Sequence, residues 1–338
     1  MDLTNPASRM PNPAVAGLTL HDVYDARTRV YRHLRPTPLL RHPLLMAELG
    51  CDVYVKHENH NPTGSFKIRG GLNLISTLTT DERSRGVVTA STGNHGQSLA
   101  MACGLEGVPC TVYVPVGNNP EKNGAMRGYG ATVIEEGRDF DEARQRCEHD
   151  AQARGSRYVH PANEPLLVAG VATYALEIFE ELPRVDIVLV PIGGGSGASG
   201  LVTVRSALGS SARIVGVQAE GADAFTRSWR TGTRVVGERV ATFAEGIATR
   251  VTFDLTYALL KPELDDIVTL TEEELAEGVR LALRATHNLA EGAGAAPLGA
   301  ARKLRHDLEG PCRVVVLVLH IDVAAEFGHQ QRVPQQRR

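Results

Sequence analysis

The 338-residue chain is 42% hydrophobic and 22% charged, and its formal net charge is −3. This composition is ordinary for a soluble globular protein and argues against nucleic acid or an anionic membrane as a partner. No apolar run has the length of a membrane span, and the five cysteines include no C-x-x-C pair, which indicates reduced thiols in a cytoplasmic protein. The length allows two domains.

Strand-like and helix-like segments alternate along the chain. In chain order we expect helix 20–34, strand 53–55, a helix beginning at Lys67, strand 87–90, helix 99–105, strand 110–114, helix 121–129, strand 131–134, helix 140–153, helix 168–181, strand 185–191, helix 198–208, strand 214–219, a helix opened by a capping box at 271–274, and strand 313–319. Apolar strands joined by helices are typical of parallel sheets covered on both faces, so the predicted fold class is α/β.

The alternation also suggests a division into domains. Residues 86–158 hold a complete series of strands and helices that could close its own sheet, so we expect a small domain there. Residues 18–85 and 159–328 would then form a larger domain. We expect a flexible arm over 1–17 and a flexible tail over 329–338.

One stretch, 61–70 with the sequence NPTGSFKIRG, places Lys67 in the first turn of a helix after a Pro/Gly turn, with Ser65 as a plausible N-cap. A helix N-terminus disfavours a cation, so Lys67 is either a solvated surface residue or shifted towards its neutral form. Neutral lysine forms Schiff bases with carbonyls. On position alone the surface interpretation is favoured.

A glycine-rich loop follows the strand predicted at 185–191 and opens the next helix. Small residues let the backbone approach an anion, and the helix N-terminus presents N–H groups to it, so we expect a phosphate site. The loop lacks the Lys-Ser/Thr of a P-loop and the spacing of G-x-G-x-x-G. A structural glycine turn is the alternative. The predicted phosphate ligands are Gly193, Gly194, Gly195, Ser196 and Gly197.

A second strand-to-helix turn comprises Ser91, Thr92, Gly93, Asn94 and His95. Its backbone N–H groups and polar side chains suit a carboxylate, and an ordinary capped helix start is the equal alternative. A Schiff-base lysine, a phosphate cradle and a carboxylate turn together indicate pyridoxal 5′-phosphate (PLP) acting on an amino acid.

A metal pair at 57–60, with the sequence HENH, is not predicted. The spacing H-x-x-H beside a strand does not place both rings on one helical face, and no acidic third ligand is evident.

The stretches 61–70, 91–97 and 191–197 resemble those of the fold-type II PLP-dependent serine/threonine dehydratases and serine racemase. The resemblance covers residues 20–328, with the motifs in the same order. The segments 118–123 and 136–144 are most similar to those of hydroxyectoine utilization dehydratases. The resemblance implies a tryptophan synthase β-like fold of two open twisted α/β/α domains with the cofactor in the cleft between them. It also implies a homodimer acting on a small-molecule amino acid.

The resemblance further implies a role for each matching residue. Lys67 would hold PLP as a Schiff base and move the Cα proton. Phe66 would flank the ring, Asn94 would bond the phenolic oxygen, and Glu291 matches a glutamate near the ring. Residues 193–197 would hold the phosphate, and residues 91–95 would bind the substrate carboxylate. The implied reaction is elimination of a β-hydroxyl, giving a 2-oxo acid and ammonia. Thr92 stands where the racemases have a serine base, which favours elimination over racemisation.

Three departures from the family pattern matter. The last strand runs directly into Leu319, His320 and Ile321, without the serine that meets the pyridine nitrogen in the family. Gln218 and Ala224 replace the acidic ligands of the family's metal site, so no metal is predicted. No regulatory domain is expected. The alternatives left open are β-replacement of the cysteine synthase type and a PLP-binding protein with impaired catalysis.

Overall fold

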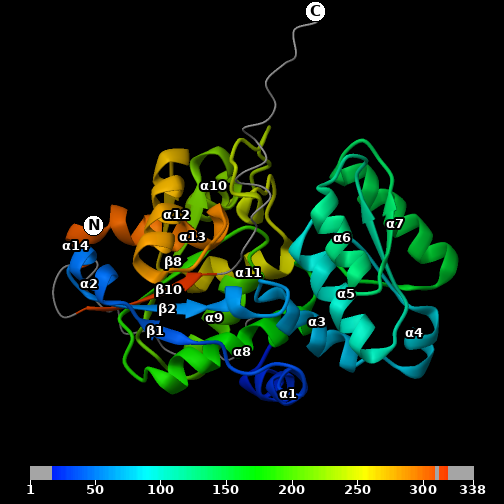
Figure 1. The fold of residues 1–338 in the computed structure, drawn as a ribbon, viewed down its shortest axis with the longest axis horizontal. Coiled ribbons are helices and arrows are strands. Elements are labelled where there is room, and N and C mark those ends of the chain that lie inside the picture. The colour runs from blue at the N-terminus through cyan, green and yellow to red at the C-terminus, as the bar shows by residue number, and fades with distance from the viewer. Residues whose placement is uncertain (1–16, 309–311, 319–338) are drawn as a thin grey trace, which may run out of the picture.

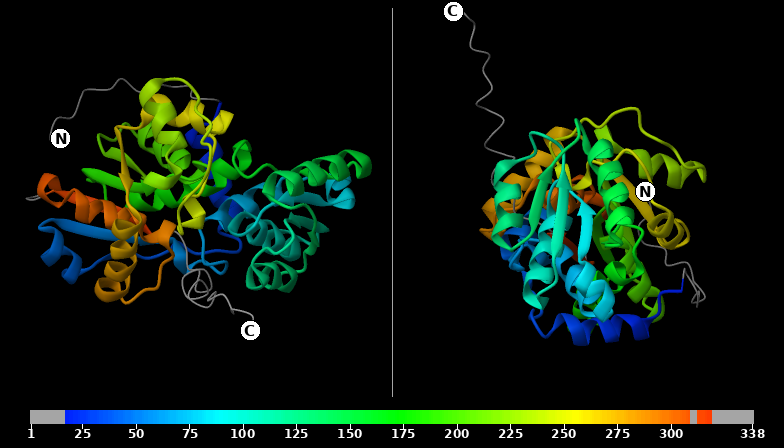
Figure 2. Two further views of the ribbon diagram at one scale, coloured as in Figure 1. Left: turned by 90° about the horizontal axis from the view of Figure 1, so that it is seen from above. Right: turned by 90° about the vertical axis from the view of Figure 1, so that its right-hand side faces the viewer.

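The structure, a computed structural model, describes residues 17–308 and 312–318. Their strands form two sheets that lie side by side along the long axis of the molecule (Figures 1 and 2). The larger sheet has the order β1-β2-β10-β7-β8-β9, and all its neighbouring pairs are parallel except β1 with β2. Its strands are β1 (Leu39–Arg41), β2 (Asp52–His57), β7 (Ile187–Pro191), β8 (Arg213–Ala219), β9 (Asp266–Leu270) and β10 (Arg313–Val318).

The smaller sheet is wholly parallel and has the order β5-β4-β3-β6. Its strands are β3 (Val87–Ala90), β4 (Cys110–Val114), β5 (Thr132–Glu135) and β6 (Arg157–Tyr158). The helices around the two sheets are α1 (Leu20–Val30), α2 (Pro43–Leu49), α3 (Lys67–Ser76), α4 (Thr80–Arg85), α5 (Asn94–Glu106), α6 (Pro120–Gly128), α7 (Phe140–Arg154), α8 (Pro165–Glu181), α9 (Ser196–Ala207), α10 (Ala224–Thr231), α11 (Asp254–Glu263), α12 (Glu272–Thr286), α13 (Gly292–Lys303) and α14 (Arg305–Leu308).

The larger sheet is buried on both faces, as its continuous apolar strands predict. On β10, Val314 and Val316 point into the cluster that contains α12 and α13, whereas Val315 and Leu317 point into the cluster that contains α8 and α9. Since successive side chains of a strand face opposite sides, only a strand covered on both sides needs apolar residues at every position. The predicted α/β class is confirmed.

Helix α3 lies between the two sheets. It packs against α5 beside the smaller sheet and against α8 beside the larger one. Its apolar residues, Ile68, Leu72, Leu74 and Ile75, belong to the same buried cluster as β3 and β4. The residue at its first position, Lys67, is therefore held where the two sheets approach each other. The predicted boundary between a small domain at 86–158 and the rest of the chain stays a prediction.

Most of the predicted elements are found, and their ends differ by a few residues. The first helix ends at Val30 rather than at residue 34, and the N-cap of α3 is Phe66 rather than Ser65. The capping box of α12 is confirmed: the Thr271 hydroxyl accepts from the Glu274 N–H, and the Glu274 carboxylate accepts from the Thr271 N–H. Among the described helices, none combines the length and the apolar character that crossing a bilayer requires.

Candidate active site

The turn before α3 fixes the backbone of Lys67 from two sides. The Ser65 hydroxyl accepts a hydrogen bond from the Lys67 N–H at 3.3 Å. The Ser98 hydroxyl, from α5, donates to the Lys67 carbonyl at 2.7 Å. The lysine side chain therefore leaves α3 in a direction set by both the turn and the neighbouring helix.

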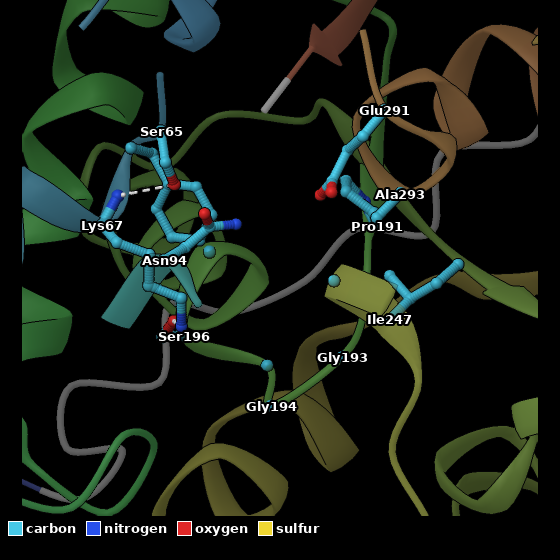
Figure 3. A pocket seen from close by; sticks show the side chains of 14 residues that line it. Ser65, Lys67, Asn94, Pro191, Gly193, Gly194, Ser196, Ile247, Glu291 and Ala293 are labelled. Carbon is cyan, nitrogen blue, oxygen red and sulfur yellow. Dashed lines mark hydrogen bonds between the residues drawn. The ribbon is translucent and has the colours of Figure 1, made fainter. Parts of the chain in front are cut away.

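The side chain of Lys67 lines a cavity. Figure 3 shows Ser65, Lys67, Asn94 and Ser196 together on one side of this cavity, and Glu291 with Ala293 on the other. The lining residues are Ser65, Phe66, Lys67, Asn94, Pro191, Gly193, Gly194, Gly195, Ser196, Gly197, Gly246, Ile247, Glu291 and Ala293. The structure thus brings Lys67, the glycine loop, Asn94 and Glu291 to one place, although they are far apart in sequence.

The protonation equilibrium of the Lys67 side chain is shifted towards the neutral amine. Burial of its side chain lowers the pKa of Lys67 from 10.5 to about 8. Its Nζ donates to a hydroxyl, Ser196 Oγ, at 3.0 Å, and lies 5.3 Å from the centre of the Phe66 ring. The surface interpretation of this lysine does not hold in the structure. The neutral amine is the form that attacks carbonyls, and a lowered pKa increases the fraction of Lys67 in this form.

The glycine loop leads from β7 to the N-terminus of α9. Gly195 is the N-cap of α9 with a φ of +88°, a conformation that favours glycine. A Cβ atom at Gly193 would lie 2.3 Å from the Gly246 carbonyl oxygen, so no larger residue fits there without movement. The first N–H groups of α9 have no partner within a helix and attract an anion. This geometry suits a phosphate.

Asn94 carries a second indication of a bound group. Its side-chain Oδ1 is buried at the cavity and has no hydrogen-bond partner among the described residues. A buried polar atom without a partner is costly, and a polar ligand would satisfy it. The lysine, the glycine loop and this amide together fit an aldehyde that carries a phosphate and a polar ring substituent.

Of the other members of the predicted carboxylate turn, Ser91 and His95 form hydrogen bonds within the protein. Ser91 Oγ accepts from the N–H groups of Gly93 and Gly96 at 3.3 and 3.0 Å. The His95 ring is buried against Thr89 Oγ1 at 3.0 Å, and this burial lowers the pKa of His95 to about 3. Thr92 is exposed. Of the turn, only Asn94 lines the cavity, so carboxylate binding by residues 91–95 stays a prediction.

Sequence reasoning missed the segment that closes the cavity beside the glycine loop. Gly246 and Ile247, in the short 3-10 helix η3 (Glu245–Ile247), line the cavity. Next to them, Glu245 forms an ion pair with Lys122 of α6, a helix beside the smaller sheet. This segment has no helical or strand periodicity, and a close backbone approach such as Gly246 to Gly193 leaves no pattern in the sequence.

Two other sequence features can be placed. His57 is buried and its Nε2 lies 3.1 Å from His42 Nε2, while the His60 ring stacks on His57 with ring centres 4.9 Å apart. Among the described residues, no group of three or more His, Cys, Asp or Glu side chains is arranged to hold a metal ion. The Leu319-His320-Ile321 end of the last strand lies outside the described residues.

Comparison with known proteins agrees with this site. Residues 30–320 match the family model described as pyridoxal-phosphate dependent enzyme. An L-threonine ammonia-lyase of Thermotoga maritima is 38% identical over 283 residues, covering 84% of this chain and 71% of that protein. A catabolic L-threonine dehydratase of Staphylococcus aureus is 33% identical over 305 residues, covering 89% of this chain and 88% of that protein.

The fold is shared with a solved structure of the processed form of threonine deaminase isoform 2 from Solanum lycopersicum. The TM-score is 0.89 at 26% identity, over 96% of this chain and 95% of that one. The fold-type II architecture inferred from the sequence is thereby confirmed. This chain belongs to the family of pyridoxal-phosphate dependent enzymes.

Proposed function

We propose that the protein is a PLP-dependent ammonia-lyase that removes the β-hydroxyl of a hydroxy amino acid and gives a 2-oxo acid and ammonia. The observation that carries the proposal is Lys67, whose lowered pKa and position facing the glycine loop suit a Schiff-base lysine. Relatives named L-threonine ammonia-lyase and L-threonine dehydratase support this reaction class.

In this proposal the chain holds the cofactor at three points. Lys67 Nζ would bond its aldehyde carbon, residues 193–197 would hold its phosphate at the start of α9, and Asn94 would contact its phenolic oxygen. Phe66 flanks the ring. Bound PLP supplies an electron sink for the electron pair left on the substrate Cα.

The same lysine would then move protons. As a free amine at the cavity wall, Lys67 Nζ would take the substrate Cα proton as a general base. Because its pKa is about 8, a substantial fraction is neutral near pH 8. The overall reaction consumes and releases no net water, since the water lost with the β-hydroxyl is regained when the imine is hydrolysed to the 2-oxo acid and ammonia.

The substrate is the finer part of the proposal. Serine and threonine are the candidates that the names of the relatives favour. The resemblance of 118–123 and 136–144 to hydroxyectoine utilization dehydratases adds a hydroxyectoine-derived acid as a third candidate. Thr92 in place of a racemase serine supports elimination over racemisation.

The test is a panel assay of 2-oxo acid release from L-serine, L-threonine and other β-hydroxy amino acids. We expect release from at least one of them. In Lys67→Ala the rate of release should fall at least about 10³-fold, and the visible absorbance of bound PLP should disappear. Lys303→Ala, a surface lysine paired with Glu274, is the matched control and should keep both signals. A colourless wild-type protein that forms no 2-oxo acid would refute the proposal.

Two alternatives have distinct outcomes. Formation of cysteine from O-acetylserine and sulfide would identify a β-replacement enzyme. Visible PLP absorbance without turnover of any substrate in either assay would identify a PLP-binding protein with impaired catalysis.

We also propose the organisation that accompanies this function: a large PLP-binding domain of residues 18–85 and 159–328, a small domain of residues 86–158, and a cytoplasmic homodimer. Light scattering of the purified protein tests the homodimer. Limited proteolysis near residues 86 and 158 tests the domain boundaries.

A further inference from the structure

Glu291 occupies the wall of the cavity that faces Lys67. Figure 3 shows its carboxylate projecting across the cavity towards the side that carries Lys67 and Asn94. The other lining residues on its side, Ala293, Ile247 and Pro191, have apolar side chains. Among the described lining residues, Glu291 is thus the polar side chain of the wall opposite the lysine.

The local structure directs this carboxylate into the cavity. Glu291 is the N-cap of α13, yet its side chain makes no capping hydrogen bond. A Cβ atom at Gly246 would lie 2.7 Å from Glu291 Oε1, so the glycine leaves the space that this side chain fills. Glu291 is buried, with 5% of its surface exposed. The positive end of the α13 dipole stabilises a negative charge at this position.

The structure of the PLP ring determines which of its atoms would face Glu291. In PLP the carbon that carries the aldehyde and the ring nitrogen occupy opposite corners of the six-membered ring. A ring joined to Lys67 at the first corner and held across the cavity therefore turns its nitrogen towards the wall opposite Lys67. A buried ring nitrogen needs a polar partner, because burying a polar atom without one costs free energy.

We propose that Glu291 is the partner of the ring nitrogen and that its carboxylate keeps this nitrogen protonated. The inference rests on the proposed binding of PLP by Lys67. A carboxylate accepts a charge-assisted hydrogen bond from a protonated nitrogen, whereas a hydroxyl, which can donate its own proton, would leave the nitrogen neutral. A protonated ring withdraws electrons from the substrate Cα more strongly, so Glu291 strengthens the electron sink that the cofactor supplies.

The proposal is tested by ¹⁵N NMR of the protein loaded with PLP labelled at the ring nitrogen. We expect the wild-type signal in the upfield range of a protonated pyridine between pH 6 and 8, and the signal of a neutral pyridine in Glu291→Gln. The dissociation constant of PLP should rise about 10- to 100-fold in Glu291→Leu, which can form no hydrogen bond, the usual effect of losing a hydrogen bond to a charged group.

A PLP analogue with CH in place of the ring nitrogen separates this contact from general damage to the site. We expect the wild type to prefer PLP over the analogue, and Glu291→Leu to bind both about equally. Glu135→Gln, on the smaller sheet and paired with Arg127, is the matched control and should behave as the wild type. Equal melting curves of the apo proteins would show that the substitutions leave the fold intact.

Two results would overturn the inference: a neutral nitrogen in the wild type, or a protonated nitrogen that persists in Glu291→Gln. In the second case, loss of the protonated signal in His320→Ala would identify His320 as the partner. His320 follows the last strand in sequence and is the competing partner. A wild-type protein without visible PLP absorbance would instead contradict the proposed function, so the two failures are distinguishable.

Discussion

Lys67 and Arg69 lie two residues apart at the start of α3, and their surroundings give the two cations opposite properties. Lys67 faces the cavity, where its ammonium meets a hydroxyl, and burial lowers its pKa to about 8. Arg69 is fully buried on the other side of the helix among carboxylates. Burial by itself opposes its charge, but Glu58 and Glu177 outweigh that effect and raise the pKa of the guanidinium.

The carboxylates around Arg69 form a buried charge cluster, which we define as Lys56, Glu58, Arg69 and Glu177. Arg69 donates to Glu58 Oε2 at 2.7 Å and to Glu177 Oε1 at 2.6 Å, and Lys56 donates to Glu177 Oε2 at 2.5 Å. Two cations and two carboxylates balance within the cluster. Buried charges that are fully paired resist change, whereas a buried lysine that meets only a hydroxyl can exchange its proton near neutral pH. The first arrangement stabilises the structure, and the second suits the reactive role proposed for Lys67.

The cluster also holds the turn that carries Lys67. Glu58 accepts from Asn61 Nδ2 at 2.9 Å and from Arg69, so it binds residues on both sides of the lysine. Because Lys56 and Glu58 come from the end of β2 and the helix after it, the turn is anchored to the larger sheet. The rigid cluster is therefore expected to position the reactive lysine.

Breaking the cluster should have the largest effect. Glu58→Ala removes one of the two carboxylates that pair with Arg69 and one acceptor of Asn61. Removing one member of a buried ion pair costs about 3–5 kcal/mol of unfolding free energy. Urea denaturation of the apo protein measures this loss, and bound PLP absorbance should fall as well. Glu135→Ala, at an exposed ion pair, is the control and should change stability little. Stability in Glu58→Ala equal to that of the wild type would contradict a structural role for the cluster.

The glycine loop is the next point at which the cavity can be disturbed. Gly193→Ala would place a Cβ atom 2.3 Å from the Gly246 carbonyl oxygen, which forces the loop and η3 apart. Overpacking of this kind costs about 1–3 kcal/mol, so PLP affinity should fall about 5- to 150-fold. Titration of the apo protein with PLP measures the affinity. Gly124→Ala, where a Cβ atom meets nothing within 4 Å, should bind PLP as the wild type does; equal affinities for all three proteins would show that the loop yields without cost.

The pH dependence of PLP capture tests Lys67 directly. Only the neutral amine attacks the aldehyde, and the pKa of Lys67 is lowered to about 8, so the rate should rise about tenfold per pH unit below pH 8 and level off above it. Stopped-flow absorbance of the apo protein mixed with PLP measures this rate. Lys67→Ala should show no such phase. A rate that keeps rising up to pH 10 would mean that the lysine has its ordinary pKa.

These comparisons also show what the sequence could and could not predict. Lys67, the glycine loop and Asn94 follow turn signals at strand-to-helix junctions, so short patterns made them candidates. On position alone, however, Lys67 was better explained as a surface residue, and the role expected of Asn94 came from the family resemblance. Arg69 and Glu58 lie in the same stretch but depend on Glu177, more than a hundred residues away, and no local pattern pairs them. Gly246 was missed for a similar reason, because its role comes from backbone atoms of the glycine loop. Glu291 was found only through the family resemblance.

Tyr174 contacts both the glycine loop and Phe66, and removing its hydroxyl should have the smallest effect. The Tyr174 hydroxyl donates to the Gly197 carbonyl at 2.9 Å, and its ring packs edge-on against Phe66 with ring centres 6.4 Å apart. Tyr174→Phe keeps the ring and removes one hydrogen bond, which costs about 0.5–1.5 kcal/mol, so PLP affinity should fall about 2- to 12-fold. Pyridoxal, which has no phosphate, should bind the variant and the wild type equally, because the lost contact supports the phosphate loop. An equal loss for pyridoxal and PLP would instead mean that Tyr174 acts through Phe66 and the ring.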